Sequence, residues 1–141
     1  MRLAMQLGHC PAPVKIAPAR EARSLEEIAI DNAGEGCGRE LFGAVLNQFQ
    51  ATHATDDRVR AVMGAIAGDE RAHANYSFAL AEALQSRLTI AQRRRAKEAQ
   101  EHTLSVLSEN ATSDSLRRTL GLMDGEQVAS TARNLLDTQR L

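Results

Sequence analysis

Glu70 and His73 stand three residues apart in the stretch AVMGAIAGDERAHANYSFALAEAL, residues 61–84. In a helix of about 3.6 residues per turn, side chains at this spacing project from one face. A carboxylate and an imidazole presented together can bind a transition metal such as iron. The same face carries a stripe of apolar and small residues, namely Val59, Val62, Met63, Ile66, Ser77, Leu80, Ala81 and Leu84. The spacing therefore predicts that Glu70 and His73 lie in the seam between this helix and the core.

A third ligand is expected from the preceding segment, because a buried carboxylate needs a partner. If segments 25–53 and 57–87 form an antiparallel helix pair, equal counting from the turn places Glu40 opposite Glu70. Glu35 lies about five residues from Glu40 and belongs to a second apolar stripe of the same helix. The residues alone therefore predict Glu40, Glu70 and His73 as the metal ligands.

The segment that carries Glu35 and Glu40 is predicted to be one helix over residues 25–53. Ser24 precedes it in the phrase SLEE and stands three residues before Glu27, which is a capping-box pattern. Glycines at positions 34, 36 and 38 weaken the helix by roughly 1 kcal/mol each. They also permit a local bulge and a close neighbour.

The rest of the chain also reads as helical. Thr55 or Asp56 can cap a second helix over 57–87, and a third is expected over 90–109. A weaker helix begins near Asp114, breaks around GLMDG and continues in EQVASTARNLLDTQRL. No strand-like alternation is present. The prediction is an all-α antiparallel bundle of about four helices over residues 22–141, preceded by an extended arm over residues 1–21 that holds all three prolines.

Composition excludes several classes of protein. A chain of 141 residues with a net charge of −1 suits one domain and has no bulk attraction for nucleic acid. No apolar run is long enough to span a membrane. Two cysteines, Cys10 and Cys37, make no disulfide framework, and Cys37 is expected to be a small core residue. The apolar part of the N-terminus is short and interrupted, which favours a cytoplasmic protein and leaves an exported or lipidated form as the alternative.

The phrases IDNAGEGCGRELFGA and DERAHA, within residues 24–88, resemble the ferritin-like superfamily of diiron-carboxylate bundles, in particular small bacterial ferritin-like domain proteins. The resemblance implies half of a dinuclear iron centre, with Glu40 as a terminal ligand, Glu70 as the bridging ligand and His73 as the terminal imidazole. Glu35 is the alternative to Glu40, because some members of the family have a longer span between the two helices. Manganese is a second candidate ion. Such centres react with O2 or peroxide, which implies a ferroxidase or other oxidoreductase activity, or the scavenging of oxidant.

The second half of that ligand pattern is missing, because no Glu-x-x-His follows His73. The later segments offer only scattered candidates, namely Glu98, Glu101, His102, Glu109 and Glu126. Two interpretations remain. Either a second subunit completes the site in a homodimer, or the site is mononuclear, weak or lost. The alternative function is a metal-free helical module for interaction or assembly, with a degenerate metal site.

Overall fold

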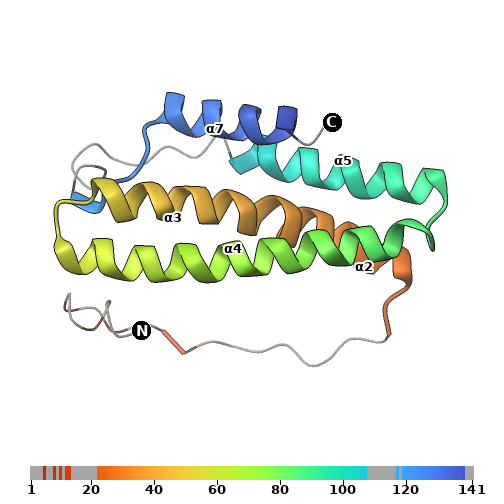
Figure 1. The fold of residues 1–141 in the computed structure, drawn as a ribbon, viewed down its shortest axis with the longest axis horizontal. Helices are drawn as coiled ribbons and strands as arrows, with labels where there is room; N and C mark the ends of the chain where they lie inside the picture. Colours follow the sequence, from red (N-terminus) through yellow and green to blue (C-terminus); the bar gives the residue numbers. More distant parts are fainter. Residues whose placement is uncertain are drawn as a thin grey trace.

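The computed structural model describes residues 22–107 and 119–138, together with Met5, Gly8, Cys10, Ala12, Pro13 and Arg117. Within these residues the chain forms four helices and no strand (Figure 1). The first helix is continuous and is made of α2 (Leu25–Asp31), η1 (Asn32–Glu40) and α3 (Leu41–His53); α4 (Asp57–Gln85), α5 (Ile90–Leu107) and α7 (Gly125–Thr138) follow. The all-helical prediction is confirmed. Most of the predicted arm over residues 1–21 lies outside the described residues.

The first helix begins and ends where the sequence predicts. The hydroxyl of Ser24 accepts a hydrogen bond from the backbone N–H of Glu27 at 3.2 Å. The carboxylate of Glu27 accepts one from the backbone N–H of Ser24 at 2.8 Å, which completes the capping box. At the other end, the chain turns at Ala54, and Asp56 caps α4 by accepting from the N–H of Arg58 at 2.8 Å.

The glycine-rich middle of the first helix, η1, is a π-helix over its nine residues. The bulge predicted from the glycines is thus confirmed. Gly36 faces α4, and a Cβ atom at this position would collide with the side chain of Ser77. On the side of α5, Thr103 Oγ1 lies 3.2 Å from the position that a Cβ would take at Gly34. The absence of side chains therefore lets α4 and α5 approach the first helix closely from two sides.

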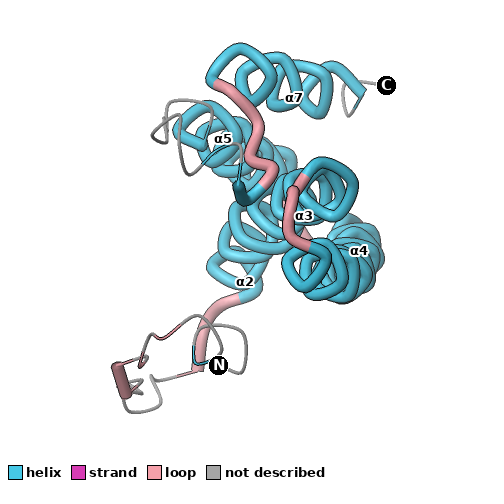
Figure 2. The backbone as a smooth tube through the Cα atoms, turned by 90° about the vertical axis from the view of Figure 1, so that its left-hand side faces the viewer, coloured by secondary structure: helices cyan, strands magenta, loops and turns pink. Residues whose placement is uncertain are grey.

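The other helices are arranged around the first helix rather than in a closed ring. α4 packs along α3 and η1, and α5 packs along η1 and α2, while α4 and α5 barely contact each other. α7 lies over α5 and α3, away from α4 (Figure 2). α4 ends two residues before the end predicted for the second helix. α5 matches the predicted third helix over 90–109, of which residues 108 and 109 lie outside the described part. α7 corresponds to the resumed portion of the predicted fourth helix, and the portion near residue 114 is not described.

A turn before α7 is fastened to the end of the first helix. Gly121 has a backbone φ of 65°, a conformation that favours glycine, and a Cβ there would collide with the backbone of Ala54. Nearby, the side-chain amide of Gln50 donates to the carbonyl of Leu120 at 3.0 Å. This contact sets the start of α7 against α3.

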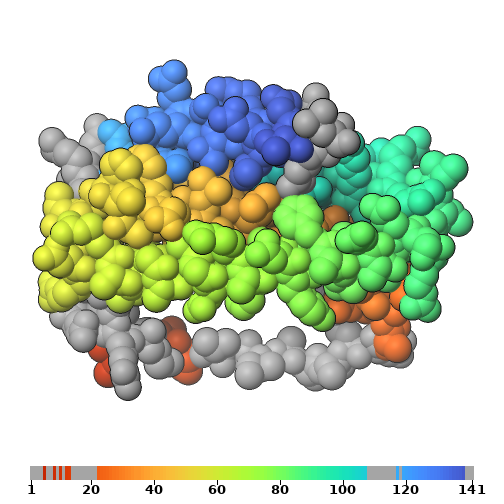
Figure 3. Space-filling view, in the orientation of Figure 1, coloured from red at the N-terminus to blue at the C-terminus, as the bar shows by residue number. Residues whose placement is uncertain are grey.

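The hydrophobic core lies between α3, α5 and α7. Its buried members are Phe42, Leu104, Val128 and Ala132, and partly buried hydrophobic residues surround them. α4 lies on the other side of the first helix. In Figure 3 it runs across one face of the molecule with its outer side chains at the surface. α4 is therefore a peripheral helix with one covered face.

None of the described helices is both long enough and apolar enough to cross a bilayer.

Candidate metal centre

Three of the predicted ligands come together between the first helix and α4. Glu40 is the last residue of η1, and Glu70 and His73 lie one turn apart in the middle of α4. Each residue offers one ligand atom, and these atoms lie within 4.8 Å of one another. Nδ1 of His73 is 3.8 Å from Oε1 of Glu40. The register that pairs Glu40 with Glu70 is therefore confirmed.

Local sequence explains this convergence. The short turn after His53 reverses the chain, and Asp56 starts α4 at once, so that α3 and α4 run antiparallel. Gly43 lies next to the site on α3, and a Cβ there would be 4.0 Å from the carboxylate carbon of Glu70. The bare backbone at Gly43 leaves the Glu70 carboxylate close to α3, on the side of Glu40.

The exposure of the site differs from the sequence prediction. Glu40 and Glu70 are half-buried, but the side chain of His73 is 61% exposed. The prediction that His73 lies in the seam of the core is wrong. The stripe on α4 is covered by the first helix alone, because the core and α7 lie on the opposite side of that helix. His73 lies at the lateral edge of the covered face of α4, where the first helix does not shield its side chain from solvent.

The charge balance of the site leaves the two carboxylates accessible to a cation. Among the described residues, no Lys or Arg lies within ion-pair distance of Glu40 or Glu70. The nearby guanidinium groups are engaged elsewhere: Arg39 donates to Glu35 at 2.9 Å, and Arg71 donates to the side-chain carbonyl of Gln48 at 3.2 Å. The cluster therefore has an excess of negative charge with only the imidazole of His73 beside it.

The structure does not bring Glu35 into this group. Its carboxylate is exposed on another face of η1 and pairs with Arg39, one turn further along. Among the later candidates, His102 and Glu126 are exposed on α5 and α7, and Glu109 lies outside the described residues. Within the described residues, Glu40, Glu70 and His73 form the one group close enough to hold a metal ion.

One turn from this group lies a buried polar level, which we call the Ser77 level, made of Asn32, Gly36, Cys37 and Ser77. The side-chain amide of Asn32 donates to the backbone carbonyl of Ser77 at 2.9 Å. Cys37 is 3% exposed, as expected of a core residue. Burial, together with the negative charge of Glu40, raises the pKa of the Cys37 thiol to about 11. Sequence reasoning missed Asn32, although an amide within a stripe of small residues was the available signal.

The donor set fits a first-row transition metal. Two carboxylates and one imidazole are ligands that suit iron and manganese. Metal–ligand bonds of about 2.0–2.2 Å place donors on opposite sides of an ion about 4.2 Å apart. The present spacing of the ligand atoms, within 4.8 Å, is close to that value.

Comparison with known proteins adds no assignment. No protein family model, curated protein sequence or solved structure matches this chain. The chemistry of the site is therefore inferred from its own side chains.

Proposed function

We propose that this chain is a ferritin-like iron-binding protein whose ligands are Glu40, Glu70 and His73. The observation that carries the proposal is the convergence of two carboxylates and an imidazole from two helices, with no cation of the described chain beside the carboxylates. Burying or clustering acidic groups without such a partner is unfavourable. A divalent cation removes this cost and gives the arrangement a physical reason.

The exposed face of α4 supports association with a second copy of the chain. Its outer residues are small, namely Ala61, Ala65, Gly68, Ala72, Ala79 and Ala83, and all of them are exposed. Small side chains let two helices approach closely. Tyr76 is 73% exposed beside this face and would gain cover. Glu70 points from the opposite side of α4 toward Gly43, so contact through this face alone would leave the two clusters apart. A dinuclear centre in a homodimer would need the second copy to approach the exposed edge of the cluster at His73, where two sets of Glu40, Glu70 and His73 could meet about a two-fold axis.

In such a centre each side chain has a distinct part. Glu70 would be the bridging ligand, Glu40 and His73 would be terminal ligands, and the four carboxylates of the dimer would offset the charge of the metal. Bound iron would supply the reduction of O2 or peroxide, with Fe(II) oxidised to Fe(III). In a single copy of the chain, the exposed side chain of His73 leaves the site open to these small oxidants. Manganese is the alternative ion, because the same ligands bind it.

The first test measures metal and mass on the same sample. The full chain is loaded with Fe(II) without oxygen, desalted, and examined by elemental analysis and light scattering. We expect about one iron ion per chain in a dimer, as a shared two-fold centre requires. The variant Glu70→Ala with His73→Ala should retain none. A matched control, Asp69→Ala with Glu82→Ala, removes exposed groups from the same helix outside the cluster and should bind iron normally.

Thermal unfolding provides a second readout. Fe(II) should raise the Tm of the wild type and of the control, because a ligand that binds only the folded state stabilises it. It should leave the Tm of the double variant unchanged. A dimer that retains neither iron nor manganese would overturn the metal proposal. The exposed α4 face would then favour the second candidate function, a metal-free assembly module.

A further inference from the structure

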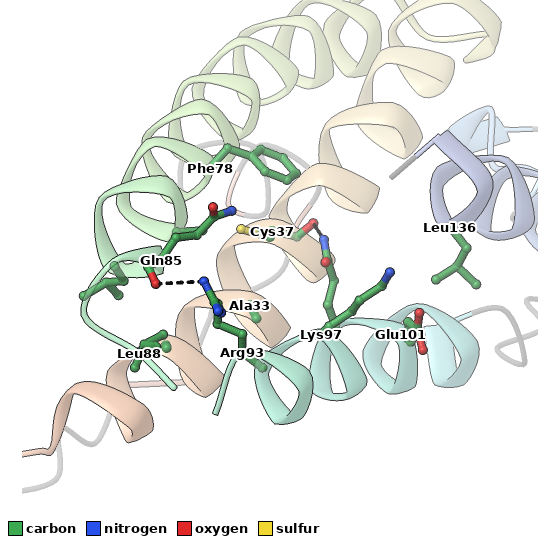
Figure 4. A pocket seen from close by; sticks show the side chains of 14 residues that line it. Ala33, Cys37, Phe78, Gln85, Leu88, Arg93, Lys97, Glu101 and Leu136 are labelled. Atoms are coloured by element: carbon green, nitrogen blue, oxygen red, sulfur yellow. Dashed lines mark hydrogen bonds between the residues drawn. The ribbon is translucent and has the colours of Figure 1, made fainter. Parts of the chain in front are cut away.

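A second site lies between α4 and α5, where these two helices diverge. It is a cavity of about 480 Å³ above α2 and η1 (Figure 4). Phe78 lies on the α4 side, Leu88 near the α4–α5 turn, and Leu136 of α7 at the far side. Its volume is in the range of pockets that hold small organic molecules. The cavity exists because both helices pack on the first helix and leave a gap between themselves.

The walls of this pocket are mostly aliphatic. Alanines form much of the lining, and their small side chains leave room between the helices. Leucines and one phenylalanine complete it. The apolar lining residues are Ala29, Ala33, Phe78, Ala81, Leu84, Leu88, Ala96 and Leu136. Aromatic ligands usually stack on rings, and this lining offers a single ring. An alkyl chain, in contrast, gains dispersion contacts from any aliphatic wall. The lining therefore favours an aliphatic occupant.

The polar groups of the pocket favour an acidic end on that occupant. Arg93 and Lys97 line it together with one carboxylate, Glu101. Arg93 donates to the backbone carbonyl of Gln85 at 3.3 Å. Lys97 has no carboxylate within ion-pair distance among the described residues. In Figure 4 its side chain extends across the pocket toward Leu136, away from Arg93.

We propose that this pocket binds a single-chain aliphatic carboxylate, such as a medium-chain fatty acid. The alkyl chain lies along the alanine-lined floor between α4 and α5, and the carboxylate pairs with the ammonium group of Lys97. Lys97 is exposed at the edge of the pocket, so the pair is a charge-assisted hydrogen bond that selects the head group, while the alkyl chain supplies most of the affinity. The proposal is independent of the metal centre, because neither Glu40, Glu70 nor His73 lines the cavity.

Calorimetric titration of the full chain with dodecanoate, below its micelle concentration, tests the proposal. We expect saturable binding of one molecule per chain. Dodecanol and dodecyltrimethylammonium have the same tail with a neutral or a positive head, and both should bind at least threefold more weakly, since they lack the charged hydrogen bond. Across octanoate, decanoate and dodecanoate, affinity should rise about fourfold per methylene and then level off where the cavity ends.

Two pairs of variants locate the site. Lys97→Gln should weaken dodecanoate about threefold to fivefold and leave dodecanol unchanged. Arg94→Gln is its matched control, because Arg94 is on the same helix, exposed and paired with Glu98 at 3.3 Å, outside the cavity. Ala96→Leu should fill the pocket and abolish binding, whereas Ala91→Leu, at an exposed position of α5, should not. Circular dichroism of each variant shows whether the helices are intact.

Three results would overturn the proposal. The first is the absence of saturable binding by the wild type. The second is equal affinity for the three head groups, which would remove the role of Lys97. The third is an affinity that keeps rising with chain length and is unchanged by both Lys97→Gln and Ala96→Leu. That result would indicate adsorption to the surface of the protein.

Discussion

Two levels of the interface between the first helix and α4 differ in burial although they lie about one turn apart. The Ser77 level holds neutral polar groups that are enclosed and hydrogen-bonded to each other. The level of Glu40, Glu70 and His73 holds ionisable groups that remain in contact with water. The first level fixes how closely the two helices approach. The second has no packing role that would conflict with ligand binding, so its side chains are free to adjust around an ion.

The largest expected effect comes from adding a methyl group at the Ser77 level. Gly36→Ala should destabilise the protein by about 2 kcal/mol, because the new Cβ collides with Ser77 and separates η1 from α4. Urea unfolding followed by circular dichroism measures it. Gly64→Ala is the matched control on the same interface partner, α4: Gly64 is exposed, a Cβ there would lie 3.7 Å from the Cβ of Ala51, and the change should stabilise by about 0.5–1 kcal/mol.

A companion variant shows whether the collision is the cause. Gly36→Ala combined with Ser77→Gly removes the obstructing side chain and should recover part of the lost stability. If Gly36→Ala is as stable as the wild type, the two helices are not held as closely as the Ser77 level implies.

The next effect is a dependence on pH in the alkaline range. The pKa of Cys37 is raised to about 11 from an ordinary value of 9.0. The neutral thiol therefore contributes stability that is complete below pH 9 and is lost as the pH rises toward 11. Relative to Cys37→Ala, the wild type should lose about 1 kcal/mol between pH 8 and pH 10.

Unfolding of both proteins at the two pH values checks this, with Cys10→Ala as the control at an exposed thiol. Parallel behaviour of the wild type and Cys37→Ala would mean that the Cys37 thiol ionises as freely as an exposed one.

The smallest effect is expected at the level of the candidate ligands when no metal is present. Glu70→Gln with His73→Gln, studied with a chelator, should raise the free energy of unfolding by no more than about 0.5 kcal/mol, because it relieves the repulsion between the half-buried Glu70 and Glu40 at a site that is open to water. Thermal melts of chelated protein measure it. If the free energy of unfolding falls by several kcal/mol, Glu70 and His73 stabilise the helix pair, and the contrast between the two levels does not hold.

Much of the fold follows from local sequence. Ser24 and Glu27 start the first helix by a capping box that needs no tertiary contact, and Asp56 starts α4 in a similar way. Because the turn between α3 and α4 is short, the register of the helix pair follows from counting, and this places Glu40 beside Glu70. These features depend on residues that are close in the chain.

The parts that sequence reasoning missed depend on distant residues. A stripe on α4 predicts a covered face, but the width of the cover depends on where α5 and α7 pack, and they pack away from His73. The pocket beside Lys97 arises from a gap between two helices that both contact a third. No periodicity in the sequence of either helix encodes such a gap.

The π-helical segment η1 has a consequence for changes in chain length. A π turn contains more residues than an α turn, so one residue lost from within 32–40 can be absorbed by a return to regular α geometry. The carboxylate of Glu26 accepts a hydrogen bond from the side-chain amide of Gln92 of α5 at 3.2 Å. After the deletion this contact would remain, and Glu40 would still face α4. The same deletion in the regular α3, at Gln48 for example, would rotate one part of the helix against the other by about 100°. A single lost codon is therefore tolerated in one short stretch of this helix and disruptive in the next.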